Sequence, residues 1–435
     1  MYRVGFGDFF LMSVPIGAGK FAHILIDCGV HAHDIGAMAD ALTLMKSDTG
    51  GKLALVIMTH RHADHISGFA SGKHVFDSMT VEQVWMPWFE EPAGKAAAIQ
   101  AGITNTASRL AQAFAARAAL SEEEMQYKRM AGNILGLTAG GNALALEVLH
   151  NFKTEAGTPT PVGYYAAGAS ATLPPILANA GLAAKVLGPP TDLALVAQMD
   201  NAAHQYLTDV DEDLEDGNRH PFDDAYSIPN FIWPSGKRAP EPLFTVEEIV
   251  RRVADNQPAM LAAAAKNADN AINNQSLVVL FTFAGKTLLF CGDAQWGNWA
   301  NFLFGGPLGT PGHTGLTKES ADILSSLDFL KVGHHGSTNA TPMDVVKALK
   351  VGCTAMCSTD PCAYGNPDKG TEVPRLPLLD ALNAKTDGRL ARSDQVPAGT
   401  KMVPDLDTPP ALRPSMPLAT PFVAGPQGKY IDYTL

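Results

Sequence analysis

Hydrophobic and polar positions divide the chain into short apolar runs separated by polar turns. The run Leu53–Met58 (LALVIM) is almost unbroken, and this pattern predicts a strand buried on both faces. Residues 277–283 and 286–290 flank Ala284-Gly285, which predicts a hairpin. A further apolar run at residues 330–332 precedes two histidines. These runs predict a core that contains β-sheet.

The middle and the end of the chain have a different pattern. Ala-rich sequence from Ala96 to Gly132 places apolar residues at helical spacing. Thr245 and Glu248 form a capping box, which predicts the start of another helix. Residues 209–224 are acidic and rich in turn residues, so we expect an exposed loop there. The Pro-rich tail from about Val396 lacks periodicity and is expected to wrap the surface or contact another subunit.

Residue types that commonly bind metal ions are concentrated directly after the apolar run Leu53–Met58. The segment THRHADH has the HxHxDH spacing. Neutral imidazoles and carboxylates are ligands that zinc, manganese and iron accept, and alternate spacing at a strand end lets His60 and His62 project toward one ion. Asp64 and His65, further into the turn, can face a second ion. A solvated His-rich turn is the alternative, but four ligand-type residues in six positions after a buried strand argue against it.

Ligand-type residues recur at two later strand ends. Asp293 follows the second strand of the hairpin after Gly292, which permits a close turn. His334 and His335 follow residues 330–332. Thr341-Pro342 then predicts a helix with Thr341 as its N-cap and the proline at its first position.

These motifs together resemble those of the metallo-β-lactamase-fold superfamily, and most closely the soluble catalytic domain of ComEC-type competence proteins. VGFGDFFLMSVP and HILIDCG are similar to the family's opening hairpin, NNQSLVVLFTFAGKTLLFCGDA to its Gly-Asp strand pair, and FLKVGHHGST to its HHGS signature. The resemblance implies an α/β fold, a four-layer αββα sandwich with a large helical insertion. The expected division is 1–75 for the N-terminal half of this domain, 76–270 for a helical and loop insertion, 271–375 for the C-terminal half, and 376–435 for a Pro-rich C-terminal segment.

The resemblance also implies a site for two divalent ions, with zinc expected and manganese or iron as alternatives. The expected ligands are His60, His62, Asp64, His65, Asp293 and His335. Asp293 is expected to bridge the ions, because each carboxylate oxygen can take one metal. Asp64 and His334 are the expected catalytic residues. We favour His335 as the ligand and His334 as the substrate contact, since successive strand residues point apart.

Several residues are expected to support this site. Asp27 ends the buried run Ile24–Ile26, where a carboxylate is costly unless paired, so we expect it to accept a ligating imidazole N–H. Three others, Asn273, Asn274 and Ser337, are candidates by resemblance and position either to contact phosphate or to support the ligand residues.

The chain departs from the family pattern at two positions. Residues 186–190 stand where many members have a further histidine, and His150 and His204 are spare candidates for that role. Asn366 replaces the histidine of a YGHP-like motif. Because an amide oxygen is a weaker ligand than imidazole, the second ion could be held less tightly, be manganese, or be absent.

Composition argues against a membrane protein and against a disulfide-stabilised one. The chain has 435 residues, 46% of them hydrophobic, and no apolar stretch approaches the length of a membrane span. Strand-like sequence begins almost at Met1, so no signal peptide is expected and we expect a cytoplasmic protein. Five cysteines are too few for a disulfide framework, and Cys353, Cys357 and Cys362 lack CxxC spacing, which favours buried free thiols.

The charge of the expected site points to hydrolysis of an anionic substrate. Two divalent ions outweigh Asp64, Asp293 and a bridging hydroxide, and the remaining positive charge favours a phosphodiester. The resemblance implies a nuclease, but the net charge of −12 and the lack of a dense Lys/Arg run argue against a nucleic-acid track. A lactone or thioester hydrolase, or a degenerate metal-binding protein that recognises a partner, are the alternatives. A diiron redox protein is disfavoured, because His62 stands where such a protein would have Glu.

Overall fold

The computed structural model describes most of the chain. Its described residues are 1–31, 38–115, 120, 125, 128, 131–132, 134–135, 141–206, 271–360, 365, 370–395 and 418–435. The Thr245 capping box, the acidic residues 209–224, Cys362, Asn366 and residues 396–417 of the tail lie outside them.

The N-terminal sheet has five strands within the described residues, in the order β1-β2-β4-β6-β7. β1 and β2 form an antiparallel hairpin, and the other neighbours are parallel. The strands are β1 (Phe9–Gly17), β2 (Lys20–Cys28), β4 (Leu55–Ile57), β6 (Val84–Pro87) and β7 (Val162–Tyr165). β4 is the central strand and is fully buried, as the unbroken apolar run predicted.

The C-terminal sheet has six strands within the described residues, in the order β13-β12-β11-β10-β9-β8. The strands are β8 (Ala183–Gly188), β9 (Val278–Phe283), β10 (Lys286–Phe290), β11 (Phe329–Lys331), β12 (Thr354–Cys357) and β13 (Leu390–Arg392). The hairpin predicted around Ala284-Gly285 is confirmed as β9 and β10. Both turn residues have left-handed backbone, with φ of 49° and 79°, as a type I′ hairpin turn requires.

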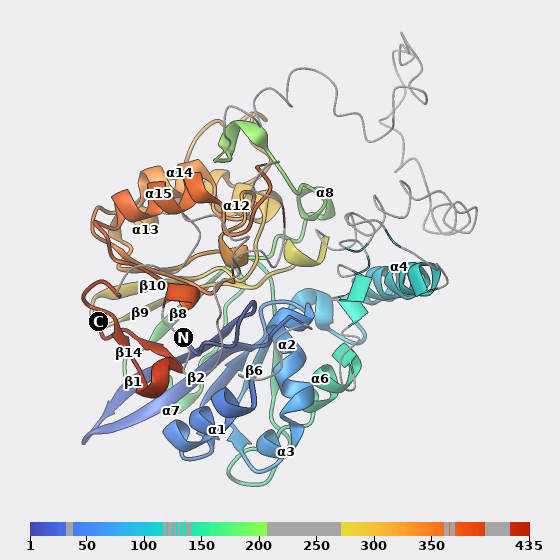
Figure 1. The fold of residues 1–435 in the computed structure, drawn as a ribbon, viewed down its shortest axis with the longest axis vertical. Coiled ribbons are helices and arrows are strands. Elements are labelled where there is room, and N and C mark those ends of the chain that lie inside the picture. Colours follow the sequence, from blue (N-terminus) through green and yellow to red (C-terminus); the bar gives the residue numbers. More distant parts are fainter. Residues whose placement is uncertain are drawn as a thin grey trace.

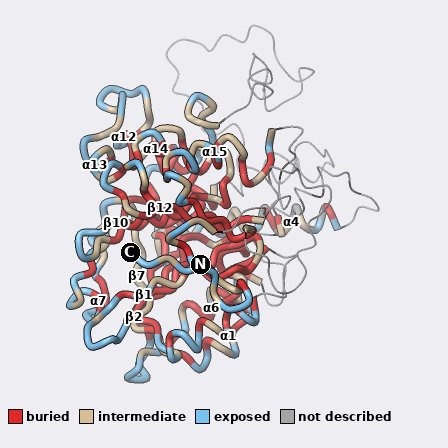
Figure 2. Tube along the Cα trace, turned by 60° about the vertical axis from the view of Figure 1, so that its left-hand side comes forward, coloured by how far each residue is buried: buried red, intermediate tan, exposed pale blue. Residues whose placement is uncertain are grey.

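The two sheets pack face to face, and helices cover the outer face of each sheet (Figure 1). Ile24 and Ile57 of the first sheet pack in one cluster with Phe290 and Phe329 of the second. The helices on the first sheet are α1 (Met38–Thr49), α2 (Ala63–Ser71), α3 (Lys73–Phe76) and α6 (Gly141–His150). Those on the second are α8 (Leu193–Val196), α12 (Trp296–Phe304), α13 (Lys318–Ser326), α14 (Met343–Ala348) and α15 (Leu376–Lys385). Buried residues follow the strands through the middle of the molecule (Figure 2).

The region expected as a helical insertion also contributes to the sheets. Helix α4 (Ala97–Ala115) lies within the predicted Ala-rich stretch. However, β6, β7 and β8 belong to residues 76–270, and all three pair with strands of the main sheets. The region also contains helix α7 (Pro175–Asn179), and its strand β5 (Thr80–Val81) pairs with β3 (Lys52–Leu53), which lies before it. Ala-rich sequence such as that of β8 favours helices in isolation, but pairing and burial beside β9 override that preference.

Two smaller predictions can be checked directly. α14 begins at Met343 with Pro342 at the N-cap position, so the predicted cap is wrong by one residue. The Thr341 hydroxyl accepts the N–H of Gly333 instead, at 3.3 Å. Cys353 and Cys357 are buried free thiols, as predicted.

The described end of the tail packs onto this chain itself. Strands β14 (Val423–Ala424) and β15 (Ile431–Asp432) form a small antiparallel pair. Phe422 and Ile431 join the cluster between the sheets, and the Tyr433 hydroxyl lies 3.0 Å from Thr354 Oγ1 of β12. The tail therefore ties the two sheets together. Among the described residues, no helix combines the length and the apolar character needed to span a lipid bilayer.

Candidate metal centre

The HxHxDH motif joins the end of β4 to the first turn of α2. His60 follows the strand, His62 is the N-cap of α2, and Asp64 and His65 lie in its first turn. A carboxylate there faces the positive end of the helix dipole, which favours its charged form. The end of β2 packs tightly against this turn: a Cβ at Gly29 would lie 2.3 Å from the backbone nitrogen of His65. Only glycine permits this approach.

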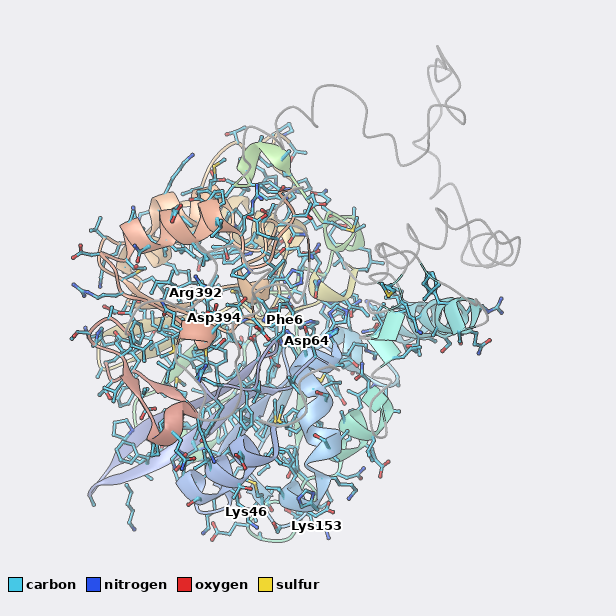
Figure 3. All side chains as sticks on the ribbon, viewed as in Figure 1. Phe6, Lys46, Asp64, Lys153, Arg392 and Asp394 are labelled. Carbon is cyan, nitrogen blue, oxygen red and sulfur yellow. The ribbon has the colours of Figure 1, made fainter. Side chains whose placement is uncertain are left out.

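Four buried side chains from both sheets converge at this turn. Asp64 and His65 come from α2, Asp293 follows β10, and His335 follows β11. One ligand atom of each lies within 4.8 Å of the others, and we call these residues the four-ligand cluster. His65 Nε2 is 3.0 Å from Asp293 Oδ2, and His335 Nε2 is 3.2 Å from Asp64 Oδ2. Asp64 lies near the middle of the molecule, close in the view to Phe6, whose ring packs 4.1 Å from that of His335 (Figure 3).

Each imidazole of the cluster is oriented by an acceptor behind it. His65 Nδ1 donates to Asp27 Oδ2 at 2.7 Å, and His335 Nδ1 donates to the Ser358 carbonyl at 2.8 Å. Asp27 also accepts the backbone N–H and the hydroxyl of Thr59, at 2.7 and 2.6 Å. The imidazole contact expected for Asp27 is thus present. This arrangement leaves the Nε2 lone pair of each histidine facing the cluster, as metal coordination requires.

The cluster also contains atoms whose hydrogen-bonding needs are not met. His65 Nε2 and Asp293 Oδ2 are buried and lie 3.0 Å apart, at ion-pair distance, yet neither makes a hydrogen bond within the described residues. Buried polar atoms without partners are costly and call for an explanation. A divalent cation would satisfy both atoms, and two imidazoles with two carboxylates form a set that such a cation accepts. The residues therefore fit a metal ion.

The electrostatic field of the site favours positive charge. Burial lowers the pKa of His65, but Asp293, Asp27 and Asp8 outweigh it and raise that pKa well above 6.5. Burial likewise opposes a charged His335, whose pKa is raised by Asp293 and by Asp64. A site whose carboxylates draw protons onto its imidazoles is suited to hold a divalent cation.

His60 and His62 lie beside the cluster but contact each other. His60 Nε2 is 3.1 Å from His62 Nδ1, and the His60 and His65 rings are 4.1 Å apart. Burial lowers the pKa of His60 well below 6.5 and that of His62 to about 4. In the described part of the chain, neither belongs to a group of three convergent ligand-type residues. We call these two residues the histidine pair.

His334 and His335 leave β11 in a strained turn rather than as strand residues. In the turn η4 (His334–Gly336), φ is 43° at His334 and 53° at His335. These values lie in the left-handed region, which residues other than glycine rarely adopt. The conformation turns His335 into the cluster and leaves His334 partly exposed, with its Nε2 3.9 Å from Asp293 Oδ2. The two histidines thus differ in burial, and the cause is the left-handed turn rather than the strand alternation that we expected.

The three polar residues expected to contact phosphate are placed differently from one another. The Asn274 amide donates to the carbonyls of Val196 and Gln198, and its oxygen accepts the N–H groups of Gln295 and Asn298. It braces the backbone around α12 and has little capacity for a ligand.

Asn273 is fully buried, and its side chain makes no hydrogen bond within the described residues. Ser337 is half-buried and its hydroxyl donates to Asn339, at 3.1 Å.

The two spare candidates for a further histidine ligand make contacts outside the cluster. His150 contacts the Leu146 carbonyl at 2.7 Å and the Tyr164 hydroxyl at 3.0 Å. His204 pairs with Asp344 and stacks on Trp296. Neither joins a group of convergent ligand-type residues in the described ranges.

Sequence reasoning missed two charged residues at the site, Asp8 and Lys331. Both are almost fully buried, with 1% and 2% of their surfaces exposed. They form an ion pair beneath the cluster. A lysine inside the apolar run FLKV is itself a signal, because lysine is almost never fully buried without a partner.

A cavity of about 410 Å³ borders the motif on the side of Arg61. Its lining includes Glu90, Glu91, Gln100 and Thr104. The Arg61 guanidinium is held by both oxygens of Glu90, at 2.9 and 2.5 Å. The lining therefore mixes polar with apolar residues such as Phe89 and Ala97, and its arginine leaves no uncompensated positive charge.

No protein-family model matches this chain, and a search of curated proteins finds no match.

Proposed function

We propose that this protein is a metal-dependent hydrolase with a metallo-β-lactamase-like, four-layer αββα fold. The observation that carries the proposal is the four-ligand cluster, in which buried imidazoles and carboxylates from both sheets face one another, and in which His65 Nε2 and Asp293 Oδ2 make no hydrogen bond within the described residues. Helix-covered sheets that share a buried face support the fold assignment.

The chain's own residues have distinct tasks in this proposal. Asp64, His65, Asp293 and His335 hold the ion, with zinc expected from the ligand types and manganese as the alternative. A divalent ion, when bound, lowers the pKa of water toward neutrality and polarises the bond to be cleaved. His334 is partly exposed beside Asp293, which suits a contact with the substrate.

We propose a phosphodiester as the substrate class. The positive centre for this anionic group requires two divalent ions, as in the charge argument from the sequence, because Asp64 and Asp293 neutralise a single ion.

A second candidate function is hydrolysis of a small uncharged molecule such as a lactone or thioester. The cavity beside Arg61 favours it over a nucleic-acid polymer, because Glu90 neutralises Arg61 and the charge of Glu91 would repel a phosphate backbone.

The test is metal content and turnover of the purified protein. We expect about one or two equivalents of zinc or manganese, and cleavage of bis(p-nitrophenyl) phosphate that a chelator abolishes. Asp293→Asn should lower turnover at least about 100-fold. His74→Ala, at an exposed histidine of α3, is the matched control and should leave turnover unchanged.

Two outcomes would redirect the proposal. Metal-dependent cleavage of a lactone or thioester but not of phosphodiesters would favour the second candidate. Tight metal binding without turnover on phosphodiester, nucleic-acid and lactone panels would contradict hydrolysis and favour a metal-binding recognition protein.

A further inference from the structure

Lys331 is a charged residue on the buried face between the sheets. It follows Phe329 by two positions in β11, so its side chain lies on the same face of the strand, toward the first sheet. Its Nζ contacts three oxygens: the carboxylate of Asp8, the Gly292 carbonyl at 2.9 Å, and Asp293 Oδ1 at 3.4 Å. An ammonium group has three N–H donors, so these acceptors use its whole capacity.

The two oxygens of Asp293 consequently have different surroundings. Oδ1 accepts the backbone N–H of His334 at 3.1 Å and faces Lys331 Nζ. Oδ2 faces the imidazoles, at 3.0 Å from His65 Nε2 and 3.6 Å from His335 Nε2. The sequence predicts one ion on each oxygen of Asp293, whereas in the structure Oδ2 alone faces the imidazoles.

Asp8 anchors the ammonium group from the opposite sheet. Its backbone N–H donates to the Asp64 carbonyl at 2.9 Å, and its own carbonyl accepts the N–H of Gly29 at 2.9 Å. The backbone of Asp8 is therefore fixed to the same turn that carries Asp64 and His65. The ion pair with Lys331 links this turn to β11 and to Asp293 across the interface of the sheets.

We propose that Lys331, anchored by Asp8, is a positioning residue that holds Asp293 in one orientation and restricts it to a single ligand oxygen, Oδ2. The proposal rests on the proposed function only in requiring that the four-ligand cluster binds a metal. Loss of the ammonium group would leave Asp293 free to rotate and to present both oxygens. The metal would then be held with altered geometry and lower affinity.

The test uses cobalt as a spectroscopic metal, with no need for turnover. Lys331→Met alone leaves Asp8 and Asp293 buried without their cation and is expected to unfold more easily. The double variant Lys331→Met/Asp8→Asn removes both charges of the pair and should fold. We expect its visible Co²⁺ spectrum to change and its Co²⁺ affinity, measured by chelator competition, to fall about tenfold or more.

Matched controls separate positioning from general stability. Lys350 and Asp328 form another Lys–Asp pair in the same half of the molecule, 2.6 Å apart and away from the cluster. Lys350→Met/Asp328→Asn should leave the spectrum and the affinity unchanged. Asp8→Asn alone keeps the ammonium group beside Asp293 but removes its anchor, so it should change the spectrum less than the double variant does.

The outcomes distinguish this inference from the proposed function. An unchanged spectrum and affinity in the double variant would overturn the inference while leaving hydrolysis intact. Failure of both Lys331 variants to fold would assign the pair to stability and would also overturn it. A changed spectrum in the variant, with no turnover by the wild type on any substrate, would support the inference and contradict the hydrolase. Absence of cobalt binding by the wild type would overturn both.

Discussion

The four-ligand cluster and the histidine pair are neighbours with different construction. The cluster draws residues from both sheets, and each of its imidazoles has an acceptor behind it. The pair comes from one loop, and its two rings contact each other. Burial lowers the pKa of every one of these histidines. At His65 and His335 neighbouring carboxylates outweigh burial and raise the pKa, whereas at both residues of the pair burial prevails. The HxHxDH motif is contiguous in sequence but is divided between these two environments.

The largest expected effect is on metal affinity when a ligand is removed from one group or the other. His335→Ala should weaken the tightest site at least about 100-fold, because it removes a coordinating nitrogen from the cluster. His62→Ala should weaken that site about tenfold or less. Competition with a chromogenic chelator measures both. Equal losses in the two variants would contradict the division between cluster and pair.

A smaller effect is expected from the residue behind a ligand. Asp27→Asn keeps the shape of the side chain but weakens its hold on His65 Nδ1, so metal affinity should fall about tenfold to 100-fold. Ser13→Ala, whose hydroxyl contacts His23 in the exposed part of the hairpin, is the control and should leave affinity unchanged. If Asp27→Asn bound metal as the wild type does, orientation by an acceptor would not distinguish the cluster.

The smallest expected effect is on the pH dependence of stability in the metal-free protein. Because the folded-state pKa values of His65 and His335 are raised, their contribution is complete below pH 6.5 and is lost as pH rises through those values. The pKa of His62 is lowered to about 4, so its contribution is lost as pH falls from 6.5 toward 4. Melting temperature should therefore fall on both sides, by several degrees.

Single variants should show which histidine causes each limb of the plot of melting temperature against pH. His335→Ala should flatten the alkaline limb, and His62→Ala should flatten the limb between pH 6.5 and 4. Since metal must displace protons from the cluster, stabilisation by added metal should grow with rising pH. Stabilisation by metal that is constant across this range would argue against the raised pKa values.

Much of the site could be predicted from local pattern. The unbroken apolar run placed His60 at the end of a buried strand, and the hairpin around Ala284-Gly285 placed Asp293 after another. Strand and turn signals of this kind depend on neighbouring residues alone, so a single sequence carries them. The strands β6, β7 and β8 were missed, because short strands take their stability from partners distant in sequence.

The sequence by itself determined which residue types stand at the strand ends, and hence that metal chemistry is the leading interpretation. The tertiary structure decided which of them converge. His335 turns inward through a strained turn, the histidine pair lies beside the cluster without joining it, and Asp8 and Lys331 form an ion pair next to Asp293. A buried charge is tolerated only beside its partner, and these partners are brought together by the packing of two sheets, which no local pattern encodes.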